Sequence, residues 1–142
     1  DISRFGKLDI IASVQPIHYP SDRELIDKHW GARGRYAYPF GSLKRSGAIL
    51  AFGSDTPIEN PDPWPAIQAA VCRKEEGITV KDAIRAYTVN AAYASNDEAV
   101  KGTLEPGKAA DFICLSDDIF QMKADAVGRL KAKRTFIGGK EI

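Results

Sequence analysis

Residues 49–57, Ile49-Leu50-Ala51-Phe52-Gly53-Ser54-Asp55-Thr56-Pro57, join an apolar run directly to a carboxylate. Fully buried parallel strands read as continuous apolar runs, and in α/β proteins reactive groups collect where such strands end. Asp55 therefore stands where a catalytic acid is expected. The alternative is an ordinary turn, because Ser, Asp and Pro are also frequent turn formers. Spacing within the stretch leaves both interpretations open.

The composition is that of an ordinary globular domain. The 142 residues are 44% hydrophobic and 27% charged, and a chain of this length buries about 70% of the surface that it exposes when unfolded. With 20 basic and 19 acidic side chains, the formal net charge is +1. Such a balance produces no positive electrostatic potential strong enough to attract nucleic acid or anionic lipid. We therefore expect neither nucleic acid nor a membrane as a partner. The short basic cluster at 131–134 is typical of a solvated strand.

The two cysteines, Cys72 and Cys114, lie in apolar surroundings and lack the CxxC spacing of a metal site. We expect both to be small core residues. No apolar run approaches the about 20 residues that span a bilayer, and no signal peptide is visible, so the cytoplasm is the expected location. The chain starts at Asp1 and its one methionine is Met122, which favours a part of a longer protein.

The first half of the sequence predicts a strand, a helical connection and a second strand. A helix ends near Phe5–Leu8, and a β-branched strand over 10–15 stops at Pro16. The spacing of Ser21 and Glu24 is that of a capping box, which predicts a helix from there to His29 or Trp30. A shorter helix over 39–44 leads into a second strand over 48–52.

The second half predicts helices followed by strands. One helix starts at Pro63 with apolar residues at helical spacing as far as Gly77, and Thr79 caps another whose apolar stripe reaches Ala91. After a turn at 105–108, strands are predicted over 112–115 and 134–137, with a hairpin turn at Gly138-Gly139. Two parallel strands alone would leave both sheet edges unpaired. We therefore expect neighbouring strands from elsewhere, as in a slice of a barrel.

Four stretches, in order, resemble the metal-dependent amidohydrolase superfamily, and within it hydrolases of the amidohydrolase-3 type. They are Ile11-Ala12-Ser13-Val14-Gln15-Pro16-Ile17-His18, Ala51-Phe52-Gly53-Ser54-Asp55-Thr56-Pro57, Ala86-Tyr87-Thr88-Val89-Asn90-Ala91-Ala92-Tyr93-Ala94 and Lys101-Gly102-Thr103-Leu104-Glu105-Pro106-Gly107-Lys108-Ala109-Ala110-Asp111-Phe112. The resemblance implies an α/β fold in which residues 1–102 form the last two strand–helix units of a (β/α)8 TIM-type barrel. Residues 103–142 would then supply strands to a small composite β-sandwich domain.

The resemblance also implies a site. Members of the family hold one or two divalent metals, usually zinc, and an aspartate that ends the eighth strand completes the set. By motif this is Asp55, the expected metal ligand and the catalytic general base toward a metal-activated water. His18 and Gln15 lie just past the preceding strand, where substrate contacts are expected, although His18 could instead only order a neighbouring loop. For His29 we expect a surface or packing role.

Most of the family's metal ligands are missing from this sequence. His18 and His29 are its only histidines, and a zinc site needs at least three protein ligands. We therefore expect no stably bound metal and no activity in this chain alone. The leading hypothesis is the C-terminal part of a hydrolase that cleaves carbon–nitrogen bonds in small non-peptide amides. Lactone opening, phosphoester cleavage and base deamination are other reactions of the same fold.

A second hypothesis belongs to a different class. The chain could be a non-catalytic assembly or folding fragment, which associates through open sheet edges with itself or with the missing N-terminal part. The absence of metal ligands motivates this hypothesis, and the association state distinguishes it from the first.

Overall fold

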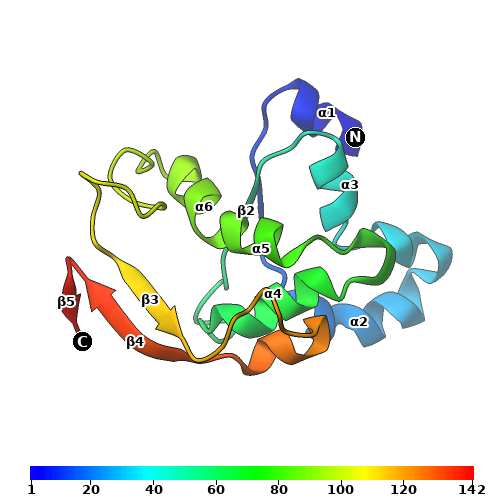
Figure 1. Ribbon diagram of the computed structural model, residues 1–142. Helices are drawn as coiled ribbons and strands as arrows, with labels where there is room; N and C mark the ends of the chain where they lie inside the picture. The colour runs from blue at the N-terminus through cyan, green and yellow to red at the C-terminus, as the bar shows by residue number, and fades with distance from the viewer.

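Two short parallel strands lie at the centre of the molecule. The computed structural model describes residues 1–142, and Figure 1 shows the pair between the N-terminal helices and α5. Strand β1 (Ala12–Val14) pairs with β2 (Leu50–Phe52), with Ala12 opposite Leu50 and Val14 opposite Phe52. The predicted parallel arrangement is confirmed, although each strand has only three residues. All three residues of β2 are buried, as its apolar sequence predicts.

The connection between these strands is helical. It consists of α2 (His18–His29), the 3-10 helix η1 (Gly31–Tyr36) and α3 (Phe40–Arg45), while α1 (Ile2–Lys7) precedes β1 and packs against α3. The capping-box prediction is wrong, because α2 starts at His18 and Ser21 lies inside it. The chain turns directly after Pro16, and the Ser21 hydroxyl donates to Glu59 instead of accepting from the helix backbone.

The first α-helix after β2 is shorter than the sequence predicts. Asp62 caps α4 (Pro63–Val71) by accepting from the Trp64 amide at 3.1 Å. The apolar spacing toward Gly77 overestimates this helix, because the chain leaves it after Val71 and continues as the 3-10 helix η2 (Lys74–Glu76).

The stripe predicted from Thr79 to Ala91 divides into two helices. Thr79 caps α5 (Val80–Tyr87) as predicted, its hydroxyl accepting from the Asp82 amide at 3.1 Å. Thr88 then breaks the helix with φ −117° and ψ −96°, and α6 (Val89–Ala94) starts in a new direction. The spacing of apolar residues indicates which residues face the core. It does not reveal a helix break at a single residue such as Thr88.

The main core fills the space between the parallel pair and helices α3, α4 and α5. Phe40 and Ile67 are almost completely buried within it. Phe52 makes edge contacts with Phe40 at 5.8 Å and with Tyr87 at 5.6 Å between ring centroids. Such aromatic pairs add about 0.5–1.5 kcal/mol each to the burial term. The core therefore ties the end of β2 to helices on both sides.

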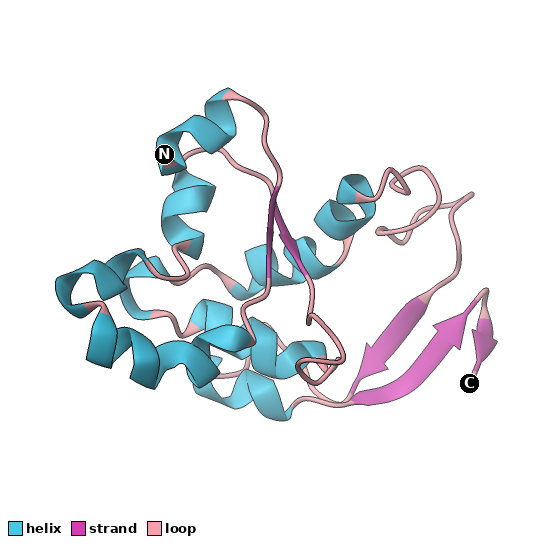
Figure 2. Ribbon diagram, turned by 180° about the vertical axis from the view of Figure 1, so that it is seen from behind, coloured by secondary structure: helices cyan, strands magenta, loops and turns pink.

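The C-terminal strands form a separate antiparallel sheet. Figure 2 shows the strands β3 (Phe112–Leu115), β4 (Ala132–Ile137) and β5 (Lys140–Glu141) to one side of the parallel pair. The predicted hairpin turn at Gly138-Gly139 is confirmed, and both glycines have positive φ. Before β4, the 3-10 helix η3 (Ala124–Arg129) packs against α4.

The cysteine and basic-cluster predictions have different outcomes. Cys72 is exposed at the end of α4, so its prediction as a core residue is wrong, whereas Cys114 is half-buried in β3. Within the basic cluster, Arg134 pairs with Glu141 at 2.7 Å across the hairpin, as suits a solvated strand. None of the helices has the length and apolar character needed to cross a membrane.

Candidate functional site

Asp55 lies in the loop that follows β2. Its backbone adopts φ +59°, a left-handed conformation that Asp tolerates better than most residues, and its carbonyl accepts from the Ile58 amide at 2.8 Å. The side-chain bonds of the turn come from its neighbours: the Ser54 and Thr56 hydroxyl oxygens are 2.8 Å apart, and Thr56 donates to the Glu59 carbonyl at 3.0 Å. The Asp55 carboxylate is therefore free of the turn's own bonding.

The carboxylate of Asp55 faces His18. The distance from His18 Nε2 to Asp55 Oδ2 is 3.3 Å, with the imidazole 22% exposed and the carboxylate 56% exposed. His18 is the first residue of α2, directly after the loop that leaves β1. Two residues that the sequence predicted for the site, from the ends of the two parallel strands, are thus in contact.

Glu59 is a third member of this cluster that the sequence analysis missed. Its carboxylate lies 3.6 Å from the other ring nitrogen, His18 Nδ1, and accepts a hydrogen bond from Ser21 at 3.1 Å. The Glu59 side chain is 26% exposed. In sequence, Glu59 is one polar residue in a polar loop, so no local pattern distinguishes it.

Gln15 contributes through its backbone. Its carbonyl accepts from the His18 amide at 3.2 Å and so helps to set the start of α2. The Gln15 side chain makes no hydrogen bond, and nothing links it to Asp55. His29, which the sequence excluded from the site, is the exposed last residue of α2.

The strand that delivers Asp55 is held by the third of the family-like stretches. Asn90 Nδ2 donates to the Leu50 carbonyl at 2.9 Å, and the Tyr87 hydroxyl donates to the Gly53 carbonyl at 3.3 Å. Burial, together with the charge of Asp62, raises the pKa of Tyr87 to about 12, so its phenol stays protonated and able to donate at neutral pH. Residues of α5 and α6 therefore position the site without touching the carboxylate.

The cluster has ligand-type side chains but not the geometry of a complete metal site. Asp55 and Glu59 approach opposite nitrogens of the same imidazole, so the three side chains do not converge on one point. The structure contains no group of three His, Cys, Asp or Glu side chains placed to hold a metal ion. A catalytic zinc needs three protein ligands, so further ligands would have to come from outside this chain.

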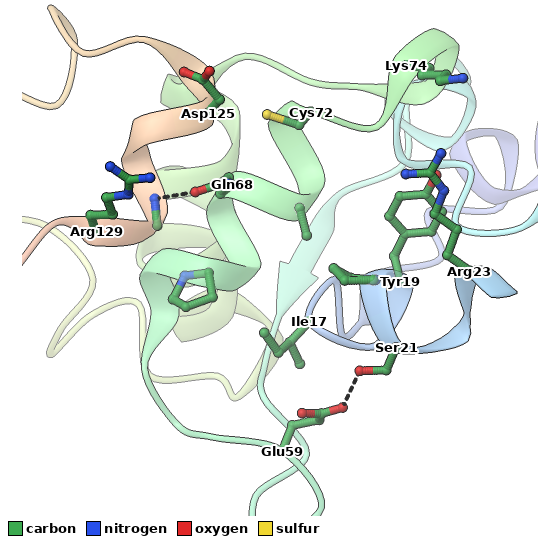
Figure 3. Close-up of a pocket in the computed structure, with 14 residues that line it drawn as sticks. Ile17, Tyr19, Ser21, Arg23, Glu59, Gln68, Cys72, Lys74, Asp125 and Arg129 are labelled. Atoms are coloured by element: carbon green, nitrogen blue, oxygen red, sulfur yellow. Dashed lines mark hydrogen bonds between the residues drawn. The ribbon is translucent and has the colours of Figure 1, made fainter.

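A cavity of about 590 Å³ adjoins the cluster. Figure 3 shows Glu59 and Ser21 at one end of it, with Ile17 between them and the body of the cavity. The opposite wall comes from α4 and η3, where Gln68 accepts from the Gly128 amide at 2.7 Å. The size is within the about 300–1,000 Å³ range of small-molecule sites.

Known proteins are similar to this chain over most or nearly all of its length. It is 36% identical over 153 residues to Protein LONG AFTER FAR-RED 3 of Arabidopsis thaliana, covering 99% of this chain and 26% of that protein. It is 28% identical over 111 residues to an N-substituted formamide deformylase of Arthrobacter pascens, covering 72% of this chain and 20% of the relative. The chain thus spans between a fifth and about a quarter of the length of these relatives.

A crystal structure is similar as well. A metal-dependent hydrolase from Pyrococcus horikoshii OT3 superimposes with a TM-score of 0.76 at 33% identity, covering 87% of this chain and 27% of that one. The mixed α/β arrangement described above is therefore similar to one part of that larger structure. The sequence profile of the amidohydrolase family matches residues 1–142, so the chain belongs to the amidohydrolase family.

Proposed function

We propose that this chain is the C-terminal part of a metal-dependent hydrolase that cleaves carbon–nitrogen bonds in small non-peptide amides. The observation that carries the proposal is the contact between Asp55 and His18 at the ends of β2 and β1, in a chain that resembles part of a metal-dependent hydrolase structure. The name of the formamide deformylase supports an amide substrate. A panel of amides, lactones and phosphoesters distinguishes the reactions that this fold could perform.

In this proposal, β1 and β2 are the last two strands of a (β/α)8 barrel within residues 1–102, and residues 103–142 belong to a β-sandwich. The two-stranded parallel sheet with helical connections supports the first assignment. The separate antiparallel sheet supports the second. The remaining barrel strands and metal ligands would then come from upstream residues.

Asp55 acts as the general base. When bound, a divalent metal, with zinc the expected ion and Asp55 one of its ligands, would lower the pKa of the attacking water to about 7. The Asp55 carboxylate, which the turn leaves unbonded, would take a proton from that water and later deliver it to the leaving nitrogen. His18 contacts the substrate and orients the Asp55 carboxylate, and Gln15, three residues before His18, is a second substrate-contacting residue in this proposal.

The test is hydrolysis by the full-length protein with and without Asp55→Asn. Asparagine keeps the shape and tolerates the left-handed backbone but cannot take a proton, so activity should fall by at least about 100-fold. Asp9→Asn is the matched control, because Asp9 is an exposed aspartate with φ +50° outside the site. Full activity in Asp55→Asn would contradict the assignment. The 142-residue chain alone should be inactive.

The second candidate function is assembly without catalysis. The two-stranded parallel sheet has both outer edges open, and such edges pair with other chains. Native mass spectrometry of the chain separates the candidates: a dimer or a complex with an N-terminal part supports assembly, and a stable monomer contradicts it.

A further inference from the structure

A second, smaller cavity lies away from Asp55, between α2, η1 and the segment that follows α4. Its volume is about 170 Å³. The charges of the residues that line it are unbalanced, since four are cationic and one is acidic: Arg23, Arg35, Arg73, Lys74 and Asp27. The guanidinium of Arg35 is partly engaged elsewhere, because it donates to the Tyr36 hydroxyl at 2.7 Å and lies over that ring.

Arg73 is the buried member of this group. The residue is 8% exposed and forms no salt bridge. Its Nη2 donates to the carbonyls of Gly34 at 3.2 Å and Ala37 at 3.0 Å, and its guanidinium stacks on Tyr19 with Cζ 4.6 Å from the ring centroid. Nη1 makes no hydrogen bond, and Nε is buried without a partner. A buried cation is costly unless an anion accompanies it.

The other cations add to this excess of positive charge. Lys74 and Arg35 form no salt bridge, and the one ion pair in the lining joins Arg23 Nε to Asp27 Oδ2 at 3.8 Å. Tyr19, Arg23 and Lys74 line both cavities, and Figure 3 shows all three on the same side of the larger one. The cavity therefore offers one buried and several exposed donors to an anion.

The size and the donors define the class of ligand. The cavity is smaller than the about 300–1,000 Å³ of ordinary small-molecule sites, so it admits one small group. Both hydrogens of Arg73 Nη2 go to the Gly34 and Ala37 carbonyls, so Nη1 is the atom that can donate to a phosphate oxygen, and a lysine adds a point charge. We propose that this cavity binds one phosphate group, either as inorganic phosphate or as the phosphate of a small monoester. The proposal is independent of the hydrolase assignment.

The test is isothermal titration calorimetry of the full-length protein with two probes, inorganic phosphate and glycerol phosphate. We expect one site per chain whose affinity falls as sodium chloride is added. Arg73→Gln should weaken binding at least about tenfold, because a charge-assisted hydrogen bond is lost. Lys74→Gln should weaken binding about three- to fivefold. Asp27→Asn should strengthen it, because a repelling charge is removed.

Arg85→Gln is the control, since Arg85 is exposed, forms no salt bridge and lies outside the cavity. Arg73→Gln also removes two hydrogen bonds to the backbone of the η1 region, so Lys74→Gln decides the result if Arg73→Gln unfolds. Tighter binding of glycerol phosphate would identify a phosphorylated molecule, and equal or tighter binding of inorganic phosphate would identify the free ion. Absence of binding, or binding that Lys74→Gln leaves unchanged, would overturn the proposal.

Discussion

The contact between His18 and Glu59 should appear as a measurable coupling between the two residues. His18 Nδ1 and Glu59 Oε1 are 3.6 Å apart, and the side chains are 22% and 26% exposed. At this distance two unit charges attract by about 1 kcal/mol in water and by about 5 kcal/mol at an effective dielectric constant of 20. Exposed ion pairs measure about 0.2–1 kcal/mol. For this partly buried pair, with a distance longer than a hydrogen bond, we expect about 1 kcal/mol.

The measurement is a double-mutant cycle with His18→Ala, Glu59→Gln and the double variant. Both partners lie in this chain, so the free energy of unfolding in urea, measured at about pH 5.5, reports the pair directly. The control is a second cycle in which Glu98→Gln replaces Glu59→Gln, because Glu98 is exposed and has no ion-pair partner. Residues that do not interact give additive effects within about 0.3–0.5 kcal/mol. Additivity of His18→Ala and Glu59→Gln within that margin would refute the coupling.

Two further predictions concern stability. Phe40 is 0% exposed and Phe120 is 62% exposed, so Phe40→Ala should cost about 3–5 kcal/mol of unfolding free energy and Phe120→Ala much less; equal losses in urea would contradict the assigned core. Burial raises the pKa of Asp82, but donation from Lys44 and Thr79 outweighs this and holds the pKa below its usual range. The ionised Asp82 carboxylate therefore contributes fully to the free energy of unfolding above its unfolded pKa of about 3.9. This contribution is lost as the pH falls through the lower pKa of the folded state. Lys44→Met should lower the free energy of unfolding by less than about 1 kcal/mol at pH 7. In an acid titration of stability, the variant should lose less unfolding free energy than the unchanged protein does.

The parts of the fold that the sequence predicted are those with a strong local pattern. The buried run before Asp55 predicted β2, and the hydroxyl of Thr79 predicted the start of α5. The predictions failed where a distant partner competes with a local one. Ser21 has the spacing of a capping residue, but its hydroxyl donates to the Glu59 carboxylate in the loop after β2. Cys72 has apolar neighbours in sequence, yet it follows the last turn of α4 at the surface.

The candidate site divides in the same way. The place of Asp55 after a strand left a catalytic acid and a turn both open, and the family resemblance favoured the acid. His18 was predicted because it follows the preceding strand, and the carboxyl ends of parallel strands lie at one edge of a sheet. Glu59 could not be predicted, because its position depends on how a polar loop folds back over α2. The cationic cavity also has no sequence pattern, since Arg73 reaches it only through the packing of α4 against α2.

The two interpretations of the stretch around Asp55 are compatible in the structure. The residues after β2 do form a turn, and the hydroxyls of Ser54 and Thr56 make its side-chain hydrogen bonds. An aspartate that stabilised its own turn would use its carboxylate for that purpose. Here the neighbours take over this role, the backbone of Asp55 adopts the left-handed conformation, and the carboxylate faces His18. A turn built in this way places an acid at the end of a strand and leaves its carboxylate free of the turn's own hydrogen bonds.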